Sequence, residues 1–257
     1  MKQYSGFYGK VPSHSDFIRH NLPRSFIDPW DDWLQSAFAA SKEQLKETWL
    51  ETYLTSPIYR FVLTPGLCGK ESHIGIVMPS VDKIGRYYPF VLSAKLDNSG
   101  NPFHFLKRYH EWFESAQKLA LSTLEDTFDL DEFTRSLTPL DMFLTQIPSN
   151  MTDSTTEENT QGDVLLIRET LDSPDQLKSL YPTLLHKTLR EVCHAYSLWW
   201  TTGSERIAPS LLISEGLPPA SNSTAIFAGD WSKWGWMDED PLPQPTANRA
   251  DNNEDPS

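Results

Sequence analysis

Two apolar runs joined by a charged, proline-bounded connection constrain the fold of this chain more than any other stretch. The runs, Ile74–Met78 and Phe90–Ala94, each have the length and β-branched content of a strand. The connection contains Gly85, which suits a backbone position with positive φ. Pro89 favours an extended conformation for the residue before it, where the second run begins. The pattern therefore predicts a stiff strand–loop–strand unit with charged groups at its tip.

Further strand candidates lie before and after this unit. Together they are residues 4–11, 17–18, 58–63, 73–78, 90–96, 164–167, 196–202 and 211–213. The strands between 58 and 96 are joined by short loops, which predicts an antiparallel meander. The order strand, helix, strand across 164–202 has the length of a right-handed parallel crossover.

Three segments, 28–42, 103–124 and 175–195, have a single apolar stripe at helical spacing. Asp28 and Pro29 suit the cap and first position of the first helix, which places Trp30 and Trp33 towards a core. A shorter helix is predicted over 129–140, ending at Pro139. Helices with one apolar stripe pack well on a sheet. We therefore predict an α/β fold, a three-layer α/β/α sandwich with a mixed, largely antiparallel central sheet.

The net charge of −13 is concentrated in two polar segments. Residues 149–163 hold four acids, and residues 237–257 hold six acids and one base. Such sequences bury too little apolar surface to order themselves, so we expect a flexible acidic loop and a disordered acidic tail. Residues 1–236 are then expected to form a single domain, with a two-domain split at 149–163 as the alternative. The absence of a clustered basic stretch argues against a nucleic-acid partner.

The two cysteines, Cys68 and Cys193, lie far apart in the sequence. We favour two buried free thiols over one disulfide. The first residues lack the apolar core of a signal peptide, and the sequence has no apolar run of about 18 residues. We therefore expect a soluble, cytoplasmic protein without direct membrane insertion.

Motifs for nucleotide binding, nucleophilic catalysis and zinc-dependent hydrolysis are not found in the sequence. Ser13–Asp16 contains the residue types of a catalytic triad, but neighbours along an extended chain point to opposite sides, so we interpret this stretch as a polar turn. His104 and His110 are six residues apart and do not share a helix face as metal ligands would. We expect no catalytic residue, no cofactor and no metal site.

Two local features of the sequence each allow two interpretations. Trp199 and Trp200 should face opposite sides of a strand, and we favour burial of both rings over a binding platform. Asp82 and Arg86 lie in the connection described first. They either form a local salt bridge that fixes the loop or contact a partner, because polar residues on rigid loops often carry binding.

Several short blocks together resemble the TagF family of bacterial type VI secretion accessory proteins. The opening blocks are Gly6–Pro12 with Asp16-Phe17, Leu22–Phe26 and Trp30–Leu34. The later blocks are Ser56–Leu63 with Pro65–Gly69, Gly75–Asp82 with Gly85–Phe90, and Ser197–Ser204 with Gly216–Pro218. The resemblance covers most of residues 4–235.

This resemblance implies a non-enzymatic, post-translational repressor of type VI secretion. It implies that the protein binds a scaffold protein of the apparatus that carries a forkhead-associated domain. The family offers no catalytic residues to carry over. Polar positions in or beside the matching blocks, Asp16, Arg19, Asp82 and Arg86, are the candidates for a partner surface. The alternatives are a structural accessory component of the apparatus and a hydrolase with an unrecognised site.

Overall fold

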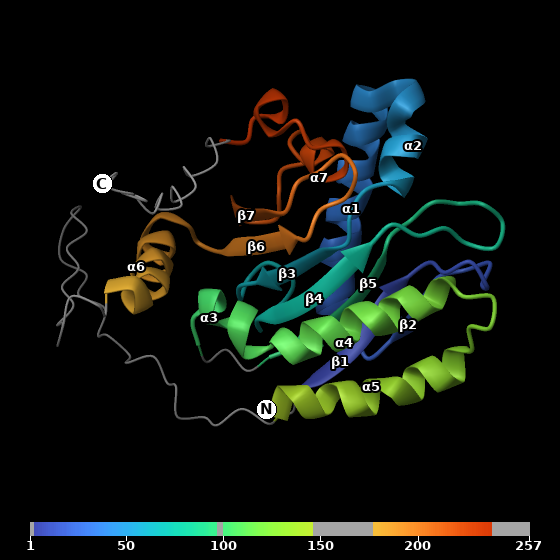
Figure 1. Cartoon of the computed structure of the whole chain (residues 1–257), viewed down its shortest axis with the longest axis horizontal. Helices are drawn as coiled ribbons and strands as arrows, with labels where there is room; N and C mark the ends of the chain where they lie inside the picture. Colours follow the sequence, from blue (N-terminus) through green and yellow to red (C-terminus); the bar gives the residue numbers. More distant parts are fainter. Residues whose placement is uncertain (1–2, 97–99, 146–176, 238–257) are drawn as a thin grey trace, which may run out of the picture.

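A seven-stranded sheet forms the middle layer of the protein, with helices on both faces (Figure 1). The computed structural model describes residues 3–96, 100–145 and 177–237. The strands are β1 (Tyr4–Gly9), β2 (Ile18–His20), β3 (Tyr59–Leu63), β4 (His73–Met78), β5 (Phe90–Lys95), β6 (Tyr196–Thr201) and β7 (Ser210–Glu215). They lie in the order β2-β1-β5-β4-β3-β6-β7, and all neighbouring pairs are antiparallel.

The predicted three-layer α/β/α fold with a largely antiparallel sheet is confirmed. The meander predicted between 58 and 96 is also confirmed, because β3, β4 and β5 are successive neighbours. Strand 164–167 and the crossover that depends on it lie outside the described residues, as does the predicted acidic loop. The predicted tail is described only at Met237.

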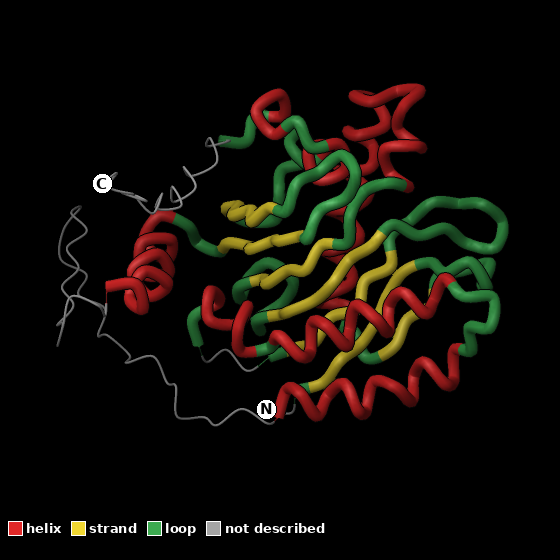
Figure 2. Tube along the Cα trace, in the orientation of Figure 1, coloured by secondary structure: helices red, strands yellow, loops and turns green. Residues whose placement is uncertain are grey.

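The helices divide between the two faces of the sheet (Figure 2). One face is covered by α1 (Arg24–Leu45), α2 (Trp49–Leu54) and α7 (Thr224–Ala228). The other is covered mainly by α4 (His110–Leu121) and α5 (Leu130–Thr145). The remaining helices are α3 (Pro102–Arg108), α6 (Leu177–Val192) and the short 3-10 helices η1 (Lys46–Thr48), η2 (Ser122–Leu124) and η4 (Trp231–Trp234).

Both faces of the central strands β3, β4 and β5 are therefore buried, which explains why their sequences do not alternate between apolar and polar residues. In β5, Phe90 and Leu92 pack into the cluster under α4 and α5, whereas Val91 packs on the α1 side. The two tryptophans of β6 divide in the same way. Trp199 is fully buried on the α1 side, and Trp200 meets the edge of the Phe113 ring at 4.7 Å on the other side. The predicted burial is confirmed for Trp199, whereas the Trp200 ring is only partly buried.

Aromatic packing holds α1 on the sheet. The Trp30 ring is fully buried and lies 5.0 Å from Phe61 and 6.0 Å from Trp199, measured between ring centroids. Trp33 lies beside it at 5.1 Å. Aromatic pairs add about 0.5–1.5 kcal/mol each beyond the area they bury. The core position predicted for Trp30 is confirmed, and Trp33 is partly buried at the edge of the same cluster.

The predicted start of α1 at Asp28 and Pro29 is wrong, because the helix begins at Arg24. The carbonyl of Pro23 accepts the amides of Phe26 and Ile27, at 2.9 and 3.0 Å. Phe26 is fully buried, so the packing of this ring favours a helix that starts one turn earlier. Pro29 then lies inside the helix, where it removes an amide donor and its ring crowds the carbonyl four residues earlier.

Two other helix boundaries also differ from the predictions. The helix predicted over 103–124 is broken at Tyr109, which has φ −106° and ψ 24°, and α3 turns away from α4 to pack against α6 (Figure 1). The helix predicted to end at Pro139 continues to Thr145. Leu140 and Leu144 extend its buried stripe past the proline, and this burial outweighs the lost amide donor.

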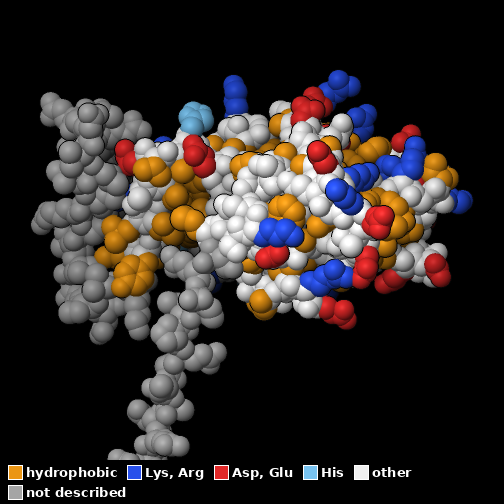
Figure 3. All heavy atoms as spheres, turned by 90° about the horizontal axis from the view of Figure 1, so that it is seen from above, with side chains coloured by type: hydrophobic (Ala, Val, Ile, Leu, Met, Phe, Trp, Pro, Cys, Tyr) orange, Lys and Arg blue, Asp and Glu red, His pale blue; other side chains and the backbone are white. Residues whose placement is uncertain are grey.

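Cys68 and Cys193 are buried free thiols, as predicted. Apolar side chains also remain exposed on α6, at Tyr181, Leu185 and Val192. On the face seen in Figure 3, basic and acidic side chains are interspersed.

A glycine in β4 makes room for a core ring. A Cβ atom on Gly75 would lie 2.2 Å from Cζ of Phe61, on the neighbouring strand β3. The Phe61 ring cannot move away, because it is fully buried between Trp30 and Trp199. We predict that Gly75→Ala lowers the free energy of unfolding by about 1–3 kcal/mol, the usual cost of overpacking. Urea denaturation measures this change, and the double variant with Phe61→Leu should recover part of it. Equal losses in the single and double variants would contradict the steric explanation.

His73 predicts a pH dependence of stability. Burial lowers the pKa of its imidazole to about 4 from an ordinary value of 6.5. The unfolded chain therefore binds a proton at His73 below about pH 6.5 that the folded protein does not bind until about pH 4, so acid favours unfolding across this window. We expect a loss of up to roughly 3 kcal/mol over these pH units.

The control is His73→Phe, because the imidazole packs against the Phe26 ring at 4.6 Å and an aromatic replacement keeps that contact. Urea denaturation at pH 7, 6 and 5 should give a flatter profile for this variant than for the unaltered protein. Identical profiles would show that His73 is not the titrating group.

Candidate functional site

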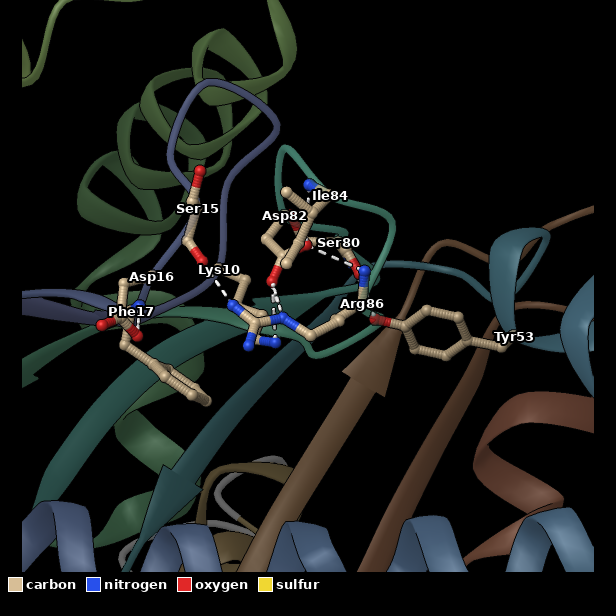
Figure 4. Close-up of polar contacts among 9 residues, drawn as sticks. All are labelled: Lys10, Ser15, Asp16, Phe17, Tyr53, Ser80, Asp82, Ile84 and Arg86. Carbon is tan, nitrogen blue, oxygen red and sulfur yellow. Dashed lines mark hydrogen bonds and ion pairs between the residues drawn. The ribbon is translucent and has the colours of Figure 1, made fainter.

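A densely hydrogen-bonded polar cluster lies where two loops meet at one end of the sheet. These loops are residues 10–17, between β1 and β2, and residues 79–89, between β4 and β5; together we call them the tip (Figure 4). They are neighbours because β1 pairs with β5 along its whole length. The backbone amide of Lys83 donates to the carbonyl of His14 at 3.0 Å, which joins the two loops directly.

The longer loop closes on itself as a tight turn. The amide of Asp82 donates to the carbonyl of Arg86, and the amide of Gly85 donates to the carbonyl of Asp82, both at 3.0 Å. Gly85 has a φ of +87°, so the prediction that this glycine provides a left-handed position is confirmed. At the start of the loop, the Tyr53 hydroxyl of α2 donates to the carbonyl of Ser80 and accepts its amide, both at 2.8 Å.

Asp82 is the centre of the tip. Its side chain is fully buried, and Oδ1 accepts the backbone amides of Ile84 and Arg86 at 3.1 and 2.8 Å. Oδ2 lies 2.6 Å from Arg86 Nε and 3.0 Å from Lys10 Nζ. One carboxylate therefore binds two cations from two loops, and all its strong acceptor positions are used.

These contacts control the protonation of Asp82. Burial alone raises the pKa of the carboxyl, but the amide of Arg86, the ammonium of Lys10, the guanidinium of Arg86 and the amide of Ile84 together hold the pKa well below its usual range. The carboxylate therefore stays charged throughout the physiological pH range. The expected local salt bridge is present.

Asp16 and Arg19 occupy different positions from Asp82 and Arg86. Asp16 is exposed, and its Oδ1 accepts the backbone amide of Phe17 at 2.8 Å. Arg19 is exposed on β2, opposite Tyr8 of β1. The structure thus brings Asp82 and Arg86 together and places Asp16 beside them on the shorter loop, whereas Arg19 lies further along on the edge strand.

An aromatic group that sequence reasoning missed lies on the α1 side of the tip. The Phe17 ring stacks on Tyr8 at 5.2 Å and meets the Tyr88 ring edge-on at 4.8 Å. The Tyr88 hydroxyl donates to Asp31 Oδ1 of α1 at 2.5 Å, and the Tyr8 hydroxyl donates to the same oxygen at 3.3 Å. Burial, followed by the contact with Asp31, raises the pKa of Tyr8 to about 12. Asp31 therefore joins α1 to strand β1 and to the longer loop of the tip.

Only a weak sequence signal indicates this aromatic group. Phe17 and Tyr88 belong to conspicuous aromatic blocks, but the closeness of positions 8, 17, 31 and 88 depends on strand pairing across the sheet. The ion pair of Lys10 with Asp82 also depends on strand pairing, because it forms only where β1 lies beside β5.

The remaining chemical candidates do not assemble into a reactive site within the described chain. Ser13 Oγ lies 2.9 Å from His14 Nδ1 on the surface, while Asp16 binds backbone instead. Among the described residues, no group of three or more His, Cys, Asp and Glu side chains is placed to hold a metal ion.

Two cavities among the described residues are candidates for a reaction site. One, of about 30 Å³, lies between α1 and the sheet among mainly apolar side chains. The other, of about 370 Å³, lies at the bend between α3 and α4, and no Ser, Thr or Cys lines it.

In the described part of the chain, no helix is both long and apolar enough to cross a membrane.

The fold places the chain in the class of three-layer α/β proteins with an antiparallel central sheet. The family can be stated more closely. The chain belongs to the TagF family: the family model for the TagF N-terminal domain, described as type VI secretion system-associated, matches residues 6–140. A crystal structure of PA0076 from Pseudomonas aeruginosa PAO1 is 32% identical in sequence, with a TM-score of 0.70. The match covers 95% of this chain and 100% of that chain. No curated protein sequence matches the chain.

The tip yields a prediction about stability. Lys10 is nearly buried, with a side chain 7% exposed, whereas the Arg86 side chain is 54% exposed. Exposed ion pairs contribute little, while removing one partner of a buried pair is strongly destabilising. We therefore expect Lys10→Met to lower the melting temperature by several degrees and Arg86→Gln to lower it much less.

The control is Lys83→Met, which removes an exposed cation from the loop that carries Arg86 and leaves the ion pairs of Asp82 in place. It should leave the melting temperature nearly unchanged. Differential scanning calorimetry measures all three variants, and equal effects of Lys10→Met and Lys83→Met would contradict the role given to Lys10.

Proposed function

We propose that this protein is a non-enzymatic, post-translational repressor of type VI secretion. It acts by binding a scaffold protein of the apparatus that carries a forkhead-associated domain, and it acts in the cytoplasm. Membership of the TagF family carries the proposal, because that family is associated with type VI secretion. The resemblance of the sequence blocks to this family supplies the repressor role and the partner.

The arrangement of the tip supports a binding role. A binding surface works best when its side chains are already ordered, because ordering them on contact costs free energy. The tip meets this requirement: its loops are joined by backbone hydrogen bonds and by the ion pairs of one buried carboxylate.

We propose that the partner surface lies at or near the tip. The exposed candidates, Asp16, Arg19 and Arg86, can contact a partner directly. Asp82 is fully buried, so its contribution is to hold the loop that carries Arg86. We further propose that residues 1–236 act as one unit, which is supported by the pairing of β6 with β3 in one sheet.

Genetic tests distinguish this role from its alternatives. A repressor predicts that deletion of the gene raises secretion through the apparatus and that overexpression lowers it, with secreted substrate measured in culture supernatants. Loss of secretion on deletion would instead indicate a structural component. Purified protein should also retain the forkhead-associated scaffold in a pull-down. Unchanged secretion together with no retention would contradict the proposal, and turnover of a small substrate would indicate a hydrolase.

A further inference from the structure

The ion pairs of the tip join two cations to a single carboxylate. Asp82 binds two cations at 2.6 and 3.0 Å, and one of them, Lys10, is nearly buried. A buried ammonium needs a counter-charge, so Lys10 and Asp82 balance each other. The charge of Arg86 is therefore surplus, although its Nε is fixed by the same carboxylate.

Arg86 is held in place and still faces outwards. Its Nε donates to Asp82, and its Nη2 donates to the backbone carbonyl of Ser15 on the other loop. More than half of its side chain is exposed. A guanidinium has five donors in a rigid plane, so these contacts leave donors available while fixing the plane. Fixed, outward donors of this kind suit a carboxylate.

Phe17 provides an exposed aromatic ring that cannot withdraw from the surface. It is 39% exposed, although it stacks on Tyr8 and meets the edge of Tyr88. Lys10 Nζ lies 5.1 Å from the centre of the ring. Contacts on three sides fix its orientation, and a fixed aromatic side chain loses little entropy when a partner covers it.

Phe17 and Arg86 belong to one surface. Both lie against the Lys10–Asp82 pair, and Tyr88, which touches Phe17, is two residues from Arg86 along the same loop. Figure 4 shows the two side chains on the lower side of the loops, whereas Ile84 points up. Aromatic side chains, phenylalanine among them, and arginine are both enriched in protein–protein interfaces.

We propose that the Phe17–Arg86 surface binds an acidic segment of a partner protein. A carboxylate of that segment pairs with the free donors of Arg86, and an adjacent apolar side chain covers the Phe17 ring. This inference rests on the proposed function, and the partner used to test it is the forkhead-associated scaffold. The charge of the surface selects the partner chemistry, because a surplus cation beside a balanced ion pair attracts an anion.

The inference assigns separate roles to the four sequence candidates. Arg86 touches the partner, whereas Asp82 positions it. Asp16 fixes the backbone at Phe17, through the hydrogen bond from the Phe17 amide. Arg19 adds positive charge on the same side of the sheet as Tyr8 without belonging to the contact. Phe17 joins these residues as the second direct contact.

Affinity measurements with purified, full-length proteins test the surface. Binding of the scaffold is measured by isothermal titration calorimetry for the unaltered protein and for Arg86→Gln, Phe17→Ala and Lys83→Gln. We expect each of the first two variants to weaken binding by about tenfold or more, as for central interface residues. The control Lys83→Gln removes a neighbouring exposed cation and should weaken binding by less than about threefold.

Two further variants separate binding from folding. Arg86→Lys keeps the charge but loses the planar fork, so it should fall between the unaltered protein and Arg86→Gln. Phe17→Leu keeps apolar cover over Tyr8 and should bind more tightly than Phe17→Ala. All variants are compared by melting temperature, and a loss of affinity counts only in variants whose melting temperature stays within a few degrees.

The chemistry of the bound group is tested by two additions. Phosphatase treatment of the scaffold should leave affinity unchanged; a loss would replace the proposed carboxylate by a phosphate and overturn this part of the inference. A peptide of residues 238–257, which carry several acids, should not compete. Competition would indicate that the surface binds the chain's own C-terminal residues, and it would overturn the proposed partner.

The two proposals fail in different ways. Failure of the unaltered protein to bind the scaffold contradicts the proposed function. Binding by the unaltered protein that Arg86→Gln and Phe17→Ala leave unchanged contradicts only the surface inferred here.

Discussion

The buried carboxylate of Asp82 is the interaction on which the candidate site depends. It binds two backbone amides of its own loop and cations from two loops, so one side chain sets the shape of the tip. The rest of the structure makes this possible. Pairing of β1 with β5 brings Lys10 beside Asp82, and Tyr53 fixes the start of the loop at Ser80. A charge at this depth is tolerable only because every contact is satisfied.

Burial by tertiary packing separates what the sequence could predict from what it could not. Strands with continuous apolar runs and helices with one apolar stripe were recognisable, because local periodicity reflects which faces are buried. Asp28–Pro29 looked like a helix start, but burial of Phe26 outweighed that local signal. Pro139 looked like a helix end, but two more buried leucines followed it. In each case tertiary packing decided the boundary.

The candidate site was predictable only in part, because some of its contacts depend on strand pairing between distant parts of the chain. Asp82 and Arg86 are four residues apart, so their salt bridge could be considered from the sequence. Lys10 and Phe17 reach the same place through strand pairing across more than 60 residues, and no local pattern records that distance. Family membership then supplied the association with type VI secretion, which geometry alone does not provide.

The continuity of the sheet has a consequence for anyone who shortens this chain. The family model ends at residue 140, yet β6 and β7 complete the sheet beyond β3 and carry Trp199 against Trp30. A fragment that stops at the family boundary would leave β3 as an unpaired apolar edge and open a hollow beside Trp30. Edges of this kind recruit other chains, so such a truncation would be prone to aggregate. The segment that the family model matches is thus shorter than the sheet, whose last two strands lie beyond it.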